Sequence, residues 1–152
     1  VSNAEFEPVA DIAIRGHGPL KRRVEPKVIA GNDVALLIDE IPILAVLGTQ
    51  TAGGIEVREA GELREKETDR IAAICENLRR MAAEVEEFDD GFKVSGSIKK
   101  QSEPFDSYGD HRIAMAFATL SSLLKDGGEV EGFESVSISN PDFLKQLNSI
   151  SS

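Results

Sequence analysis

The chain has 152 residues, 41% apolar and 29% charged, so we expect a globular domain with a real core and not a disordered segment. Its 27 acidic residues against 17 basic ones give a formal net charge of −10, which argues against general binding to nucleic acids or anionic membranes. No apolar run approaches the roughly 20 residues of a membrane helix, and residues 1–14 carry acidic side chains where a signal peptide would be basic and then apolar. The single cysteine, Cys75, cannot form an internal disulfide; this fits a reducing compartment, which we expect to be the cytoplasm.

The first part of the chain predicts alternating strands and helices. In chain order, the predicted elements are a strand over residues 9–14, a loop over 19–33, a helix over 40–50 and a strand over 55–58. Asp39 is a plausible N-cap for the helix, because Pro42 then falls in its first turn, where proline is tolerated. The basic residues 21–23 lie in the predicted loop, and we assign no functional role to them.

The clearest element is a helix between Ile71 and Ala82. Its apolar residues recur at helical spacing and form one face, which places Cys75 in the core. Residues 84–95 then predict a β-hairpin around an Asp-Asp-Gly turn. The remaining predicted elements are an extended stretch near 104–105, a helix over 113–124 capped by Asp110, strands over 129–133 and 135–138, and a last helix that starts near 140.

These elements form a faint internal repeat. Residues 39–46 resemble 110–117, because each segment opens an apolar helix with Asp and is followed by a Gly-Gly stop and a strand. The first copy, over 1–97, reads βαβαββ, and the second, over 98–152, reads βαβα without a final strand pair. We therefore predict an α/β fold of repeated units, part of which is supplied from elsewhere in a longer chain.

Three polar clusters stand where helices are expected to begin. They comprise residues 39–40, 66–70 and 110–112. Helix N-termini carry unpaired N–H groups and a partial positive charge, so they suit anions. Lys66, Arg70 and Arg112 would add the cations that a small anionic ligand needs, and the arginines offer a planar fork for carboxylate or phosphate.

Taken alone, these residues leave plainer interpretations open. Asp39 could serve only as an N-cap. Glu67 and Arg70, three residues apart, could form a surface ion pair. His111 could be a capping or merely exposed histidine. The acidic residues between 84 and 90 favour a solvated strand and turn over a metal site.

Three segments favour a more specific interpretation. Residues 37–46, 62–71 and 109–116 resemble three signature segments of the 5-enolpyruvylshikimate-3-phosphate synthase family, in its order and at about its spacing. The sequences Lys66-Glu67-Thr68-Asp69-Arg70 and Asp110-His111-Arg112 separate this family from its fold relative, the UDP-N-acetylglucosamine enolpyruvyl transferase. The resemblance runs from Pro8 to about Leu147.

The resemblance implies a partial lobe. Family members have two lobes, each resembling three βαβαββ units arranged as an inside-out α/β barrel, and this chain looks like about two of the three units of the C-terminal lobe. In the family, the closing strands come from the start of the chain, and the other lobe supplies most contacts to shikimate 3-phosphate. We therefore expect the isolated chain to be nearly inactive and to self-associate, whereas the parent enzyme is expected to be a monomer.

The resemblance also implies a reaction and roles. The family transfers the carboxyvinyl group of phosphoenolpyruvate to the 5-hydroxyl of shikimate 3-phosphate and releases phosphate, with no metal or organic cofactor. By motif match, Asp39 would be the base at the hydroxyl and Glu67 the proton donor to the methylene carbon. The motif match further implies substrate-binding roles for Lys66 beside shikimate 3-phosphate, Arg70 and Arg112 on phosphoenolpyruvate, and His111 on the phosphate side.

One departure and two alternatives remain. The family often has a lysine before its last helix that contacts phosphoenolpyruvate, and residues 129–139 contain none. The first alternative is a non-catalytic domain of the same fold that binds small anions or a partner. The second is the sister transferase acting on a nucleotide sugar, which the segment 66–70 disfavours.

Overall fold

The computed structural model describes residues 2–3, 8–9, 11, 13, 15, 25–96 and 103–150. The strands are β1 (Ser2–Asn3), β2 (Pro8–Val9), β3 (Lys27–Ile29), β4 (Ile55–Val57), β5 (Glu84–Phe88), β6 (Gly91–Ser95), β7 (Phe105–Asp106) and β8 (Val130–Glu131). The helices are α1 (Asn32–Leu37), α2 (Ile41–Thr49), α3 (Arg70–Arg79), α4 (His111–Ser122) and α5 (Phe143–Ile150), with 3₁₀ helices η1 (Gly61–Glu65) and η2 (Phe133–Ile138). The mixture confirms the predicted α/β class.

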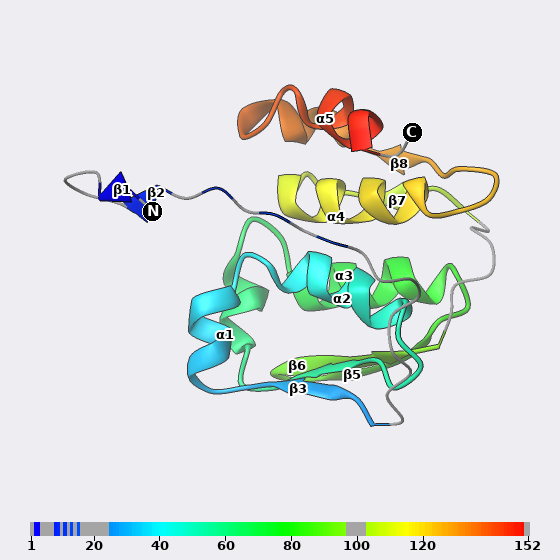
Figure 1. The fold of residues 1–152 in the computed structure, drawn as a ribbon. Helices are drawn as coiled ribbons and strands as arrows, with labels where there is room; N and C mark the ends of the chain where they lie inside the picture. The colour runs from blue at the N-terminus through cyan, green and yellow to red at the C-terminus, as the bar shows by residue number, and fades with distance from the viewer. Residues whose placement is uncertain are drawn as a thin grey trace.

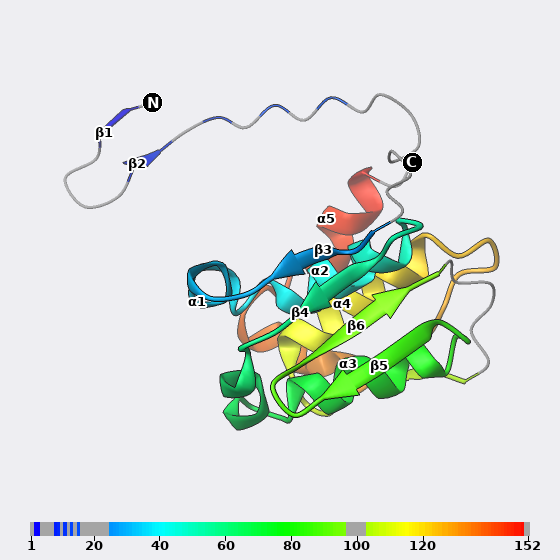
Figure 2. The same cartoon turned by 90° about the horizontal axis from the view of Figure 1, so that it is seen from below.

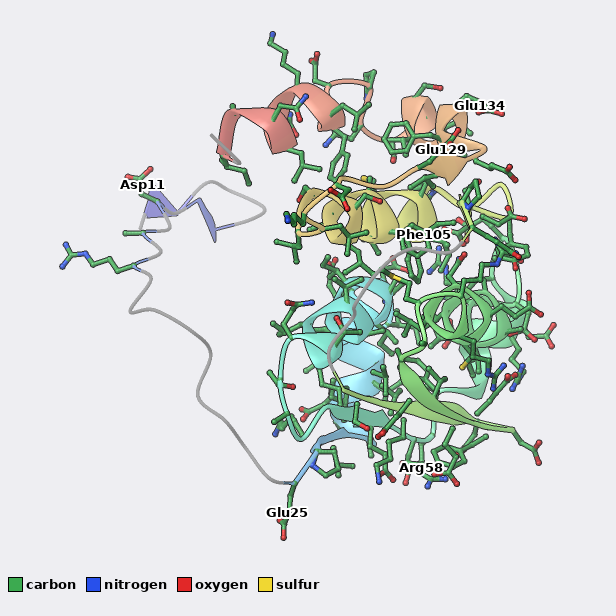
Figure 3. The ribbon with its side chains drawn as sticks, turned by 90° about the vertical axis from the view of Figure 1, so that its right-hand side faces the viewer. Asp11, Glu25, Arg58, Phe105, Glu129 and Glu134 are labelled. Atoms are coloured by element: carbon green, nitrogen blue, oxygen red, sulfur yellow. The ribbon has the colours of Figure 1, made fainter. Side chains whose placement is uncertain are left out.

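A four-stranded sheet in the order β3-β4-β6-β5 forms the base of the molecule (Figure 2). β3 and β4 run parallel, whereas β6 is antiparallel to both β4 and β5. The predicted hairpin is confirmed, with Phe88 opposite Gly91 at its tight end. Figure 3 shows Arg58 at the side of this sheet away from the helices, where its guanidinium lies 3.4 Å from the centre of the Phe88 ring.

The helices cover one side of this sheet, with α2 and α3 next to it, α4 beyond them and α5 outermost (Figure 1). The close approach of α2 depends on Gly48, where a Cβ atom would lie only 2.8 Å from the Val94 Cγ1 atom of β6. The apolar face predicted for α3 is confirmed, and Cys75 on it is fully buried. Burial raises the pKa of the Cys75 thiol to about 12.

The core continues from the sheet into the space between α3 and α4. There the Phe105 ring of β7 packs 4.8 Å from the ring of Phe117 in α4, measured between centroids (Figure 3). The largest fully buried apolar side chains are Phe92, Phe105, Phe117, Ile41, Leu63, Ile71, Ile74, Leu78, Met81, Ile113 and Leu120. One core therefore joins both copies of the predicted repeat.

The first half differs from the prediction at β3. Residues 27–29 were expected in a loop but form a strand parallel to β4, and the two helices α1 and α2 stand between these strands, so the observed order of strands and α-helices from β3 to β6 is βααβαββ. Only Ile29 of this strand is buried, which explains why its sequence carries little strand signal. Of the predicted strand over 9–14, Val9 ends β2 and residues 11 and 13 lie in no strand, whereas residues 10, 12 and 14, like the basic residues 21–23, lie outside the described residues.

The second half of the chain differs from the prediction at residues 133–138. The alternation that predicted a strand over 135–138 is misleading, because these residues belong to η2 and only Val136 among them is buried. Ile138 is 84% exposed. The chain turns into η2 at Gly132, whose φ of 69° and close approach to the Ser107 hydroxyl leave no room for a side chain. β7 and β8 pair in parallel as a separate small sheet.

Candidate active site

The starts of three helices converge on one polar cluster. α2 begins at Ile41, directly after the cluster 39–40, whereas α3 begins at Arg70 and α4 at His111, within the clusters 66–70 and 110–112. Ion pairs join the clusters, because Asp39 contacts both Arg70 and Arg112. Segments that lie 31 and 73 residues apart in the sequence are thus brought within hydrogen-bonding distance.

Arg70 is the buried centre of this cluster. Its side chain is 2% exposed and donates from three nitrogens to three carboxylates. The Nε atom lies 2.7 Å from Asp110 Oδ2, Nη1 lies 2.9 Å from Asp39 Oδ1, and Nη2 lies 2.7 Å from Glu67 Oε2. The ion pair that was left open for Glu67 and Arg70 is therefore present, but only Glu67 lies at the surface, because Arg70 is buried and also bonds two other carboxylates.

Arg112 forms the accessible side of the cluster. Its Nη2 atom lies 3.3 Å from Asp39 Oδ2, and its Nη1 atom lies 3.1 Å from Glu40 Oε1. The side chain is 31% exposed, so a ligand in solution can reach it. A cavity of about 170 Å³ lies beside it and is lined by Asp39, Glu40, Pro42, Ile43, Arg112, Met115, Ala116, Thr119 and Phe143.

Asp39 lies between the two arginines and is not a helix cap. Glu40 occupies the N-cap position of α2, and no side-chain capping bond forms there, so the predicted cap is wrong. The hydrogen bond from Arg70, together with the charge of Arg112, lowers the pKa of Asp39 below its ordinary value of 3.8. The carboxylate is therefore ionised at neutral pH.

The other two helices are capped by their own residues. Asp110 accepts from the backbone N–H groups of Arg112 and Ile113, which confirms the predicted cap of α4. Asp69 caps α3 by accepting from the N–H group of Ala72. These N–H groups are already satisfied by the capping carboxylates, so they are not free to bind an anion.

Lys66, Glu67 and His111 surround the cluster. Lys66 Nζ lies 2.6 Å from Glu62 Oε1, and its positive charge contributes to the lowered pKa of Asp39. Glu67 is half-exposed, with its carboxylate turned to Arg70. His111 is partly exposed in the first turn of α4, and among the described residues its imidazole has no hydrogen-bond partner. The structure thus brings five of the six predicted site residues into one region through contacts or charge and places His111 next to Arg112.

Sequence reasoning missed the anchoring role of Arg64. Its guanidinium bonds Asp69 at 2.6 Å and the carbonyl oxygens of Phe88 and Asp89 at 2.7 and 2.8 Å. Arg64 therefore ties the loop that carries Lys66 and Glu67 to the turn of the β5–β6 hairpin. The sequence feature that could have indicated this role is the position of Arg64, two residues before Lys66 in the polar segment.

A larger cavity of about 440 Å³ lies elsewhere, between α4, β8, η2 and α5. Its lining is mainly apolar, with Val130, Phe133 and Leu144 among the contributing residues. The charged groups of the polar cluster all lie outside this cavity. We therefore assign the candidate active site to the smaller cavity, because of the charged groups beside it and not because of its size. Within the part of the chain that the structure describes, no helix combines the length and apolar character needed to cross a membrane.

Comparisons with known proteins identify the family of this chain. The sequence model of the family described as EPSP synthase (3-phosphoshikimate 1-carboxyvinyltransferase) matches residues 5–147. The chain belongs to the EPSP synthase family. The 3-phosphoshikimate 1-carboxyvinyltransferase of Koribacter versatilis is 51% identical over 122 residues, which cover 80% of this chain and 29% of that protein. Its counterpart in Aquifex aeolicus is 43% identical over 141 residues, 93% of this chain and 32% of that protein.

A solved structure supports the same fold. The EPSP synthase of Acinetobacter baumannii superimposes with a TM-score of 0.70 at 29% sequence identity, over 84% of this chain and 30% of that one. The expected fold of the enolpyruvyl transferase type is confirmed. The chain spans about a third of the length of the relatives it matches.

Proposed function

We propose that this chain carries one side of the active site of a 3-phosphoshikimate 1-carboxyvinyltransferase. The observation that supports this most is the convergence of Asp39, Glu67, Arg70 and Arg112 from separate helix starts. The reaction joins two multiply charged anions, so it needs fixed cations to offset their repulsion. It also needs a base and an acid close together, and the cluster supplies two carboxylates on one arginine.

In the proposed mechanism, Asp39 accepts the proton of the 5-hydroxyl of shikimate 3-phosphate while the hydroxyl oxygen bonds to C2 of phosphoenolpyruvate. Glu67 gives a proton to C3, which becomes a methyl group. In the elimination step Glu67, now a carboxylate, takes a proton back from the methyl group, the C2–C3 double bond forms again as the C2–O bond to phosphate breaks, and the departing phosphate takes up the proton held by Asp39. Asp39 is ionised at neutral pH, as a base must be, although its lowered pKa makes it a weaker base while Arg70 is bonded to it.

The cations have different access to substrate. We place Arg112 on phosphoenolpyruvate and Lys66 beside shikimate 3-phosphate, because both are partly exposed. Arg70 is buried and bonded to three carboxylates, so contact with phosphoenolpyruvate requires Asp39 or Glu67 to release one of its Nη atoms. We place His111 on the phosphate side, next to Arg112.

We further propose that the boundary between the two sequence units lies near residues 97 and 98. We also propose that the protein is located in the cytoplasm. The βααβαββ order from β3 to β6 and the separate β7–β8 sheet support the division. The buried, unpaired thiol of Cys75 is consistent with a reducing compartment.

The isolated chain is expected to show almost no turnover. Asp39 and Glu67 are 46% and 50% exposed, so water has free access to the reacting groups. The test measures phosphate release from phosphoenolpyruvate and shikimate 3-phosphate, first with the chain alone and then with the complementary portion of the Koribacter versatilis relative added. We expect turnover only in the mixture. Vigorous turnover by the chain alone would show that the remainder is dispensable.

A matched variant identifies the source of that turnover. With Asp39→Asn in place of the natural chain, the mixture should lose about 100-fold or more in rate, as expected for a missing general base. Binding of phosphoenolpyruvate without any turnover in the mixture would favour the non-catalytic anion-binding alternative. Turnover of a nucleotide sugar in place of shikimate 3-phosphate would favour the sister transferase.

A further inference from the structure

We propose that Glu40 and Glu62 restrain the binding of anionic substrate by occupying Arg112 and Lys66 while the site is free of ligand. The proposal rests on the proposed function, because it concerns the same anion-binding cations. It assigns a role to two carboxylates that the reaction itself does not use.

The first restraint acts on Arg112. An arginine fork binds a carboxylate or phosphate through two parallel N–H bonds, and the end-on form of this contact uses both Nη atoms. Here Glu40 accepts from Nη1 and Asp39 accepts from Nη2. Glu40 does not cap α2, although it holds the N-cap position, and Arg112 is the side chain that its carboxylate contacts.

The second restraint acts on Lys66. Glu62 lies one helical turn earlier, at i and i+4, and its Oε1 atom is 2.6 Å from Lys66 Nζ. Lys66 is 24% exposed and Glu62 is 69% exposed, so the lysine lies in the site while its partner reaches in from solvent. A phosphate that binds Lys66 must compete with this carboxylate.

The net charge of the cluster is negative, so an anionic substrate must displace carboxylates in order to bind. The three cations Lys66, Arg70 and Arg112 face five carboxylates, those of Asp39, Glu40, Glu62, Glu67 and Asp110. The ligand-free cluster therefore has an excess of negative charge and repels an incoming anion. Asp110 is buried on Arg70, whereas Glu40 and Glu62 are the most exposed of the five, so they can turn into solvent at the lowest cost.

The test is calorimetric titration of the chain with phosphoenolpyruvate at one fixed salt concentration. Glu40→Gln and Glu62→Gln should each tighten the Kd by about two- to fivefold, the range expected for an exposed ion pair. The double variant should bind more tightly than either, and Glu40→Asp should fall between Glu40→Gln and the natural chain. Glu86→Gln, an exposed glutamate on β5, is the control because it changes the net charge equally.

The outcomes separate this inference from the proposed function. If Glu40→Gln and Glu62→Gln change the Kd no more than Glu86→Gln does, or weaken binding, the restraint is refuted while the anion site stands. If no variant binds, the double variant included, both proposals fail. Urea unfolding of each variant adds a readout, since a purely structural role predicts lower stability without tighter binding.

Discussion

Arg70 and Asp110 form an ion pair in which both side chains are almost wholly removed from water. Replacing Arg70 with Met keeps much of the apolar volume but leaves the Asp110 carboxylate buried without its cation. We expect a loss of about 3–5 kcal/mol in the free energy of unfolding, measured by urea denaturation. Arg79→Met is the control on the same helix, because its pair with Glu87 is exposed and should contribute about 1 kcal/mol or less. Equal losses would mean that burial of the pair is unimportant.

Asp39 gives the site a dependence on pH. The pKa of its carboxyl is lowered in the folded chain. The ionised carboxylate therefore stabilises the fold at pH values above its ordinary pKa of 3.8, and this stabilisation is lost as the pH falls through the lowered pKa of the folded chain. The difference in unfolding free energy between the natural chain and Asp39→Asn should therefore be constant near neutral pH and shrink below about pH 4. Urea denaturation between acidic and neutral pH measures this. A difference that is unchanged throughout would exclude the proposed ion pairs.

At the scale of elements, the distance between α2 and the sheet depends on a single glycine. Alanine at position 48 would favour the helix by about 1 kcal/mol, but its Cβ would lie 2.8 Å from Val94 Cγ1 and 3.1 Å from Ile55 Cβ. We expect the clash to dominate, with a net loss of about 1–3 kcal/mol in thermal or urea unfolding. Gly61→Ala, where nothing lies within 4 Å of the added atom, should be neutral or slightly stabilising. A stabilised Gly48→Ala chain would show that α2 can move away from the sheet.

At the scale of the whole molecule, large apolar side chains remain exposed. Leu36, Ile138 and Ile150 are each at least 80% exposed, and α5 buries only Leu147. We expect self-association that increases with concentration, measured by light scattering, because such surface is stabilised by contact with another copy. The variant Ile138→Ser combined with Ile150→Ser should reduce it. A natural chain that remains monomeric at high concentration would contradict the expectation.

The sequence predicted those features that depend on neighbouring residues. Helical spacing identified α3 and its buried face, the Asp-Asp-Gly turn identified the hairpin, and Asp110 was correctly predicted as a cap. Each of these depends on contacts within a few residues, which local propensity and periodicity report directly. The polar motifs also indicated where the site residues stand, because each motif lies at the start of a helix.

Only the tertiary structure decided how those residues meet. Arg70 pairs with Asp39 and Asp110 from segments 31 and 40 residues away, and no local pattern reports such partners. The same holds for β3, whose pairing with β4 outweighs its weak strand signal, and for η2, where the turn at Gly132 overrides an alternating sequence. The physical reason is that burying a charge or pairing a parallel strand is stabilised by partners distant in the sequence, and the fold alone brings them together.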